Sequence, residues 1–195
     1  QWFIGVDRPF GDGDSLRERG LQSVRETIDF VPSWGRNRML GMLESRPDWC
    51  LSRQRAWGLP IPAFRCEDGG TFLTAASVRA VALAFRQRGS DAWFTETPEM
   101  LLADYDHASD PDAPDGFDAG SLEKMSDIFD VWFESGSSWN AVMRERDLGY
   151  PIDVYLEGSD QHRGWFQASL LPALGATGSP PYKTLITHGF MVDKD

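Results

Sequence analysis

The stretch that decides the fold is Asp153–Leu171, which reads D-V-Y-L-E-G-S-D-Q-H-R-G-W-F-Q-A-S-L-L. It predicts a short apolar strand, an acidic turn that contains a glycine, and an amphipathic helix. A second strand is predicted at Thr184–Thr187, and His188-Gly189 follow it. Because a helical crossover returns the chain to the same side of a sheet, these strands are expected to be parallel. The pattern therefore predicts a β-α-β unit in an α/β fold.

Polar residues follow both predicted strands: Glu157, Asp160 and Gln161 come after the first, and His188 after the second. Ligands of open α/β sheets bind beyond the carboxyl ends of the strands. We therefore expect these four residues to face one crevice. Gly158 permits a sharp turn and a close approach of the backbone to a ligand.

The acidic turn has a simpler interpretation as well. Ser159 or Asp160 could cap the helix that follows, and capping alone is the commoner role of an isolated E-G-S-D string. His162 could suggest acid–base chemistry, but no paired nucleophile accompanies it, so a hydrolytic triad is not proposed.

Two tryptophans are expected to reach the same crevice. Residues 128–133, I-F-D-V-W-F, predict a strand with Trp132 near its end, and E-S-G-S-S predicts a turn after it. Trp165 falls in the first turns of the helix after Asp160. Aromatic walls suit an apolar side-chain pocket, although each tryptophan taken alone is more often a core residue.

Charge and composition exclude several classes of protein. The formal net charge of -11 argues against strong nucleic-acid binding by this chain alone. No apolar run has the roughly 18 residues that a membrane span needs, so no membrane partner is expected. Cys50 and Cys66 are expected to be free thiols in a reducing cytosol, because no set of four zinc ligands accompanies them.

The rest of the chain predicts three segments: 1–63, a smaller α+β insert at 64–127, and 128–195. The expected elements are a strand within residues 1–7, helices at Leu16–Phe30, Trp34–Glu44 and Ala75–Arg88, an irregular ordered loop at 49–62, a hairpin at Phe64–Leu73, a helix start at Thr97-Pro98, and a solvated acidic loop at Asp104–Asp118.

Two features of the insert are predicted in more detail. The inward face of Ala75–Arg88 is expected to carry Val78, Val81, Ala82 and Phe85. The string at 124–127, K-M-S-D, is similar to the start of a phosphate-binding loop, but it stands before a strand in an acidic context and is interpreted as a coincidence.

Several strings of this chain resemble the class I aminoacyl-tRNA synthetases, and most closely their isoleucyl branch. The resemblance covers essentially the whole chain and is weakest over 64–120. It is carried by Q-W-F at 1–3, W-G at 34–35, R-P-D-W-C-L-S-R-Q-R-A-W-G-L-P-I-P at 46–62, D-V-W-F-E-S-G-S at 130–137, Y-L-E-G-S-D-Q-H-R-G-W-F at 155–166 and P-Y-K-T-L-I-T-H-G-F-M-V-D at 181–193.

The resemblance implies the second half of a Rossmann-like, parallel-sheet nucleotide-binding domain, with the connective insert at 64–127. It also implies activation of isoleucine with ATP, accompanied by Mg²⁺, and transfer of the amino acid to tRNA in the cytoplasm. The site residues that it implies are Trp132, Trp165 and Gln161 for isoleucine, Glu157, Gly158, Asp160, His188 and Gly189 for the nucleotide, and Arg53, Gln54 and Trp57 as supporting residues.

The chain also departs from the family pattern. It contains no H-x-G-H motif and no complete K-M-S-K-S loop, Glu134 stands where the family usually has Asp, and the first residue is Gln1. We therefore expect an excised fragment of the catalytic core that has no catalytic residue and no metal site of its own and is inactive alone.

Two other functions are weighed against this one. A self-standing nucleotidyl transferase would need a glycine-rich phosphate loop after a first strand, and the sequence offers none. A non-catalytic tRNA-docking module is disfavoured by the net charge of -11, although Arg17–Arg38 could form a basic patch.

Overall fold

The computed structural model describes residues 1–9 and 13–194, and its contacts divide the chain into two compact units. One unit joins Gln1–Leu51 with Asp130–Asp195, and the other is the continuous segment Ser52–Phe129. We call the first the sheet unit and the second the insert unit.

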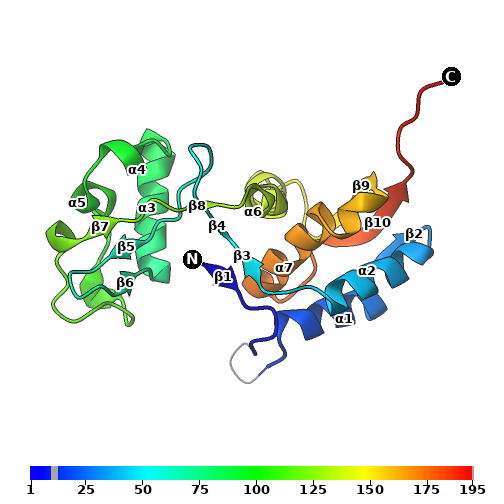
Figure 1. Ribbon diagram of the computed structural model, residues 1–195, viewed down its shortest axis with the longest axis horizontal. Helices are drawn as coiled ribbons and strands as arrows, with labels where there is room; N and C mark the ends of the chain where they lie inside the picture. The colour runs from blue at the N-terminus through cyan, green and yellow to red at the C-terminus, as the bar shows by residue number, and fades with distance from the viewer. Residues whose placement is uncertain (10–12, 195) are drawn as a thin grey trace. The chain divides into compact units, whose positions relative to one another are not determined.

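The sheet unit is built on three parallel strands in the order β2-β10-β9. Leu185 in the central strand lies between Phe30 of β2 and Tyr155 of β9. Helix α7 connects β9 to β10, so the predicted β-α-β unit is confirmed (Figure 1). The elements of the unit are β1 Phe3–Ile4, α1 Leu16–Glu26, β2 Asp29–Val31, α2 Trp34–Glu44, β3 Trp49–Cys50, α6 Val131–Gly136, the π-helical η3 Trp139–Arg144, β9 Ile152–Gly158, the 3-10 turn η4 Ser159–His162, α7 Trp165–Thr177 and β10 Tyr182–His188.

One face of this sheet forms the main hydrophobic core with α1, α2 and α7, and α1 and α2 lie side by side (Figure 1). Tyr155, Leu185 and Phe30 project into it from the three strands. Helix α7 is buried almost all round, including its polar residues Gln167 and Ser169. The prediction of an amphipathic helix is therefore wrong, because α1 and α6 pack against α7 as well as the sheet.

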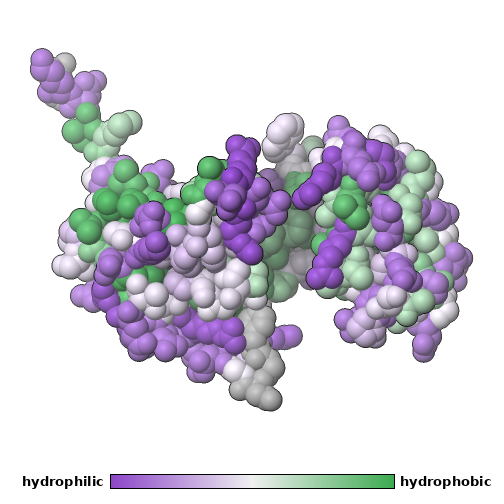
Figure 2. Space-filling model, turned by 180° about the vertical axis from the view of Figure 1, so that it is seen from behind, coloured by the Kyte–Doolittle hydropathy of each residue, from purple (hydrophilic) through white to green (hydrophobic). Residues whose placement is uncertain are grey.

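The other face of the sheet is open. Val31, Val154 and Leu156 have exposed fractions of 52%, 48% and 53%. Figure 2 shows hydrophobic residues gathered near the base of the C-terminal tail. Parallel sheets are usually covered on both faces, so this apolar face is unusual.

Two sequence predictions in the sheet unit need correction. The helix predicted to continue to Phe30 ends at Glu26, because Asp29–Val31 instead pair with β10. The strand predicted over 128–133 ends at Phe129, and Val131–Gly136 form helix α6, because the Asp130 side chain accepts the backbone N–H of Trp132 as an N-cap. Trp132 and the expected turn at Glu134 therefore lie on a helix. The predicted helix at Trp34–Glu44 is confirmed as α2.

The insert unit combines an antiparallel sheet of order β6-β5-β7 with short helices. The predicted hairpin is confirmed, since Phe64 pairs with Phe72. Its elements are β4 Ser52–Arg53, β5 Phe64–Arg65, β6 Thr71–Phe72, α3 Ala75–Arg88, α4 Ala92–Thr95, α5 Pro98–Leu101, the 3-10 turns η1 His107–Ser109 and η2 Ala119–Ser121, β7 Glu123–Lys124 and β8 Ile128–Phe129.

Helix α3 has the predicted bounds, with Thr74 as N-cap and Gly89 after its last turn at a φ of 81°. Its buried face carries Ser77, Ala80, Val81 and Ala84, whereas Ala82 is exposed, contrary to the prediction. Val81 is buried and Phe85 packs against the core formed with the hairpin and Trp93, as predicted, so the predicted inward face is correct at these two positions.

The acidic loop is largely exposed, as predicted, but it also packs on the insert core. Tyr105 and Phe117 pack on Phe72 with ring centroids 5.4 Å and 5.3 Å away. Asp110 accepts hydrogen bonds from the Thr74 hydroxyl at 2.6 Å and from the Tyr105 hydroxyl at 2.9 Å. Burial and this carboxylate raise the pKa of Tyr105 to about 12. The loop therefore closes the insert core.

None of the helices in the described part of the chain is both long and apolar enough to cross a membrane. Within the described residues, neither Cys50 nor Cys66 forms a disulfide bond.

Candidate functional site

The carboxyl ends of β9 and β10 bring the predicted nucleotide-binding residues together. Glu157 is in register with Thr187, and Gly158 with His188. His188 Nε2 lies 3.8 Å from Glu157 Oε2, and each side chain is about half exposed, at 48% and 50%. Gly189 follows at the end of β10, and its carbonyl oxygen lies 2.6 Å from His188 Nδ1. Glu157 and His188 therefore lie side by side at one sheet edge. That all four predicted residues face one ligand stays a prediction.

The turn after β9 holds Gln161 in one orientation. Its Nε2 donates to Asp160 Oδ2 at 3.0 Å, and its Oε1 accepts the backbone N–H of Trp165 at 3.0 Å. Helix α7 thus begins at Trp165 and is capped through Gln161, so the predicted capping by Ser159 or Asp160 is wrong. The 3-10 turn between β9 and α7 moves those residues away from the helix start.

Glycines make this tight turn possible. A Cβ on Gly164 would lie 2.6 Å from Gln161 Oε1, and one on Gly158 would lie 2.9 Å from Asp160 Oδ1. Any larger residue would displace the two polar side chains that the turn presents.

The two predicted tryptophans reach the same place from different helices. Trp132 projects from α6 and is 45% exposed. Trp165 stacks on Tyr155 with ring centroids 4.1 Å apart, and its Nε1 donates to the Ser135 carbonyl at 3.0 Å. A cavity of about 320 Å³ is lined by Trp132, Ser135, Glu157, Gln161 and Trp165. We call this cavity the crevice.

Helix α6 is placed by packing as well as by its cap. A Cβ on Gly136 would lie 2.1 Å from the backbone carbonyl oxygen of Ala168, so only glycine permits this contact with α7. The position of Trp132 therefore depends on the close approach of two helices.

His162 does not line the crevice. Its side chain is fully buried, its Nδ1 lies 2.9 Å from the Ser159 carbonyl oxygen, and its ring is 5.9 Å from that of Trp34. Burial lowers the pKa of His162. Its place in the structure indicates a packing role, not acid–base chemistry.

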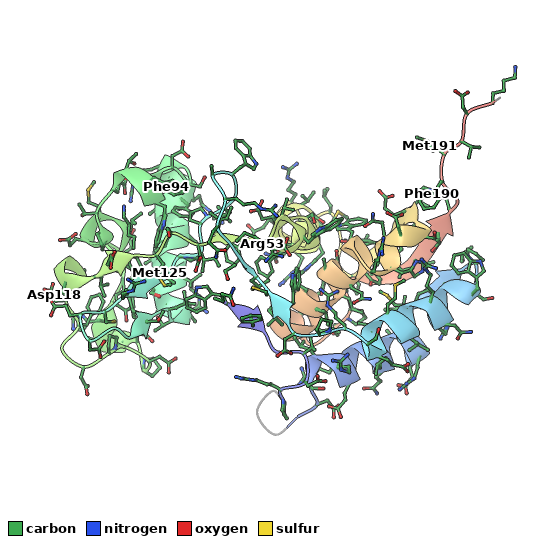
Figure 3. The ribbon with its side chains drawn as sticks, in the orientation of Figure 1. Arg53, Phe94, Asp118, Met125, Phe190 and Met191 are labelled. Carbon is green, nitrogen blue, oxygen red and sulfur yellow. The ribbon has the colours of Figure 1, made fainter. Side chains whose placement is uncertain are left out.

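The predicted supporting residues lie in the insert unit. Gln54 Nε2 donates to Asp127 Oδ1 at 2.7 Å, Arg53 donates to the Ser52 carbonyl at 3.0 Å, and Trp57 is 91% exposed (Figure 3 labels Arg53). Their supporting role stays a prediction.

The K-M-S-D string at 124–127 has a structural explanation. Lys124 Nζ donates to the Trp93 carbonyl at 2.6 Å and also to the Glu96 carbonyl. Trp93 Nε1 donates to the carbonyl of Met125, which is labelled in Figure 3, at 3.0 Å. Lys124 thus binds carbonyls at the end of α4, in line with its interpretation as a coincidence.

Four residues beside the crevice were not expected from the sequence: Arg46, Trp49, Asp130 and Gln167. The first three line a second cavity of about 330 Å³, which shares Trp132, Asp160 and Gln161 with the predicted site. Polar groups buried in this way are normally paired with one another, but no local spacing reveals such pairs. Within 1–9 and 13–194, no cluster of three or more His, Cys, Asp or Glu could hold a metal ion.

The sequence as a whole matches a known protein family. The model of the family described as "tRNA synthetases class I (I, L, M and V)" matches residues 1–195. The chain belongs to the class I tRNA synthetases. Within this family it is 46% identical over 197 residues to an isoleucine–tRNA ligase of Mesorhizobium japonicum, covering 100% of this chain and 18% of that protein.

Another class I relative, an isoleucine–tRNA ligase of Aliarcobacter butzleri, is 48% identical over 200 residues, which are 100% of this chain and 21% of that protein. The chain thus spans about a fifth of the length of these relatives. A solved structure, the ternary LeuRS–tRNA–LeuAMS complex of Agrobacterium radiobacter K84, matches 75% of this chain and 20% of its own, with a TM-score of 0.45 and 20% identity.

Proposed function

We propose that this chain is the amino-acid- and adenosine-binding part of the catalytic core of an isoleucine–tRNA ligase. The full-length enzyme would join the carboxylate of isoleucine to the α-phosphate of ATP, release pyrophosphate, and then transfer the isoleucyl group to tRNA. The observation that carries the proposal is the crevice itself, where two tryptophans, Gln161 and Glu157 meet at the carboxyl ends of parallel strands.

The isoleucine side chain is assigned to the walls made by Trp132 and Trp165. Both are rigid aromatic surfaces with few polar groups, which suits a branched aliphatic side chain. Gln161 is assigned to the amino and carboxyl end of the amino acid, because hydrogen bonds fix its amide within the same cavity.

The adenosine part is assigned to the sheet edge. Glu157, Gly158 and Asp160 would face the ribose and its neighbouring atoms, since carboxylates after a Rossmann-type strand accept hydrogen bonds from ribose hydroxyls. His188 and Gly189 would lie beside the adenine. This edge would serve as the second half of a Rossmann-like domain, with the insert unit as its connection.

ATP with its accompanying Mg²⁺, isoleucine and tRNA are the partners that we assign to the full-length enzyme, in the cytoplasm. The isolated chain is proposed to bind the adenylate weakly and to be inactive. Its sequence contains neither H-x-G-H nor K-M-S-K-S, and synthetase chemistry depends on stabilising the charge of the phosphates.

Calorimetric titration of this chain with a non-hydrolysable isoleucyl-adenylate analogue tests the proposal, with valyl and leucyl analogues as comparisons. The isoleucyl analogue should bind more tightly than the valyl one, because one buried methylene is worth about 1–3 kcal/mol. Trp132→Ala should weaken binding about tenfold or more, whereas the matched control Phe94→Ala, at an aromatic residue of the insert unit that is 61% exposed, should leave it unchanged.

Equal affinity for the three analogues in a folded chain would contradict the assignment of the tryptophan walls. The function of the full-length enzyme is tested separately by isoleucine-dependent exchange of pyrophosphate into ATP, and its absence would overturn the proposed function.

A further inference from the structure

Behind the crevice lies a group of polar side chains to which the proposed function gives no role: Arg46, Trp49, Asp130 and Gln167. The last three are 7%, 6% and 1% exposed. Burying such groups costs free energy unless they are paired, and here they pair with one another except at Arg46 Nε, which has no hydrogen-bond partner. Two branches of contacts start from the Arg46 guanidinium.

The first branch leads to the turn that carries Gln161. Arg46 Nη1 donates to Gln167 Oε1 at 3.0 Å, and Gln167 Nε2 donates to the backbone carbonyl of His162 at 2.9 Å. His162 is the last residue of the 3-10 turn Ser159–His162, which also contains Asp160 and Gln161. One buried amide thus links Arg46 to one wall of the crevice.

The second branch leads to the helix that carries Trp132. The Arg46 guanidinium lies over the Trp49 ring, 5.1 Å from its centroid. Trp49 Nε1 donates to Asp130 Oδ2 at 2.9 Å, and Asp130 Oδ1 accepts the backbone N–H of Trp132 at 3.2 Å. The cap of α6 is therefore tied to the same guanidinium.

We propose that Arg46 and Gln167 are positioning residues that fix the Gln161 turn against the Trp132 wall and thereby set the affinity for isoleucine. The inference rests on the proposed function, because it names residues that act on the same crevice. A planar guanidinium can stack on Trp49 and donate to Gln167 at once, which a lysine ammonium cannot do.

Arg36 offers a matched control in the same unit. It lies over the Phe30 ring at 5.4 Å and donates to the carbonyls of Val24, Arg25 and Ile28. Its contacts join α1, β2 and α2 without a link to the crevice. Arg36→Lys should therefore lower stability without changing substrate affinity.

The test measures isoleucine-dependent pyrophosphate exchange by the full-length synthetase that contains this chain. Arg46→Lys should raise KM for isoleucine about tenfold, the effect of losing one hydrogen bond to a charged group, and change kcat less than about twofold. Gln167→Glu keeps an oxygen for Arg46 but loses the donor to His162, so it should raise KM similarly. The double variant should resemble Arg46→Lys alone, because that change already breaks the branch through Gln167 as well as the contact with Trp49.

The proposal is overturned if both single variants keep KM within about twofold of the wild type, if their effects multiply in the double variant, or if Arg36→Lys raises KM as much. If Arg46→Lys does not fold, Gln167→Glu decides alone. A wild-type enzyme without isoleucine-dependent exchange would overturn the proposed function instead, whatever the variants show.

Discussion

Helices α3 and α6 both begin with a side-chain N-cap, but the cap of α3 depends on local residues and the cap of α6 on a distant one. Thr74 caps the 14-residue α3 in a box with Ser77, three residues away, through bonds of 3.0 Å and 2.9 Å. Asp130 caps the six-residue α6, and its other oxygen is held by Trp49, 81 positions away. The first helix is specified by its own sequence, and the second by the rest of the fold.

The difference matters because α6 carries Trp132, a wall of the crevice. A helix of six residues is too short to be stable by propensity, so tertiary contacts must supply its stability. Changes to those contacts should therefore cost more than changes to the local cap of α3.

The largest effect is expected for Gly136→Ala. The new Cβ would meet the Ala168 carbonyl oxygen at 2.1 Å, so α6 and α7 must separate. We expect a loss of about 3 kcal/mol in the free energy of unfolding of the sheet unit, measured by denaturant titration with hydrogen exchange to assign the unit.

Gly41→Ala is the matched control for this change. No atom lies within 4 Å of a Cβ at Gly41, and the residue is within α2, so alanine should stabilise the chain by up to about 1 kcal/mol. Equal responses of the two variants would show that the contact of α6 with α7 is not the cause.

A smaller effect, about 2 kcal/mol, is expected for Asp130→Ala. It removes the α6 cap and leaves the buried Trp49 Nε1 without its acceptor. The same titration measures it, and Asp91→Ala, at an N-cap without a side-chain bond, should change stability by less than about 0.5 kcal/mol. A loss at Asp130 no larger than at Asp91 would refute the tertiary role of this cap.

The smallest effect is expected for Thr74→Ala in the insert unit. Loss of a local cap costs about 1 kcal/mol, and hydrogen exchange should place it within α3 and the loop that contains Asp110. Ser33→Ala is the control, since the Ser33 side chain makes no capping bond to α2. A change that spreads to α6 would mean that the two helices are not independent.

The same contrast explains what the sequence could predict. Periodicity and capping residues were enough for α2, α3, the hairpin and the β-α-β unit, because those signals are local. The aromatic and β-branched string at 128–133 predicts a strand, because nothing in it reveals that Trp49 Nε1 donates a hydrogen bond to Asp130. The prediction that Trp132 reaches the crevice is nevertheless correct.

The residues at the site also fall into two groups, those that a local string predicts and those that only the folded structure brings together. Glu157, Gln161 and Trp165 follow from one continuous string, and strand topology brings His188 beside Glu157. Arg46 and Gln167, by contrast, are 121 positions apart, and only the folded packing of α7 unites them. The roles of Arg53, Gln54 and Trp57 remain predictions.

The pairing of β2 with β10 affects the order in which parts of the chain can fold during synthesis. Asp29 pairs with Thr184, so β2 is made long before its partner strand exists. At about 5–20 residues per second, roughly eight to thirty seconds pass on the ribosome before Thr184 is made. The hairpin and α3 of the insert, whose contacts are close in sequence, can form during that delay, whereas the three-stranded sheet cannot be completed until β10 is made.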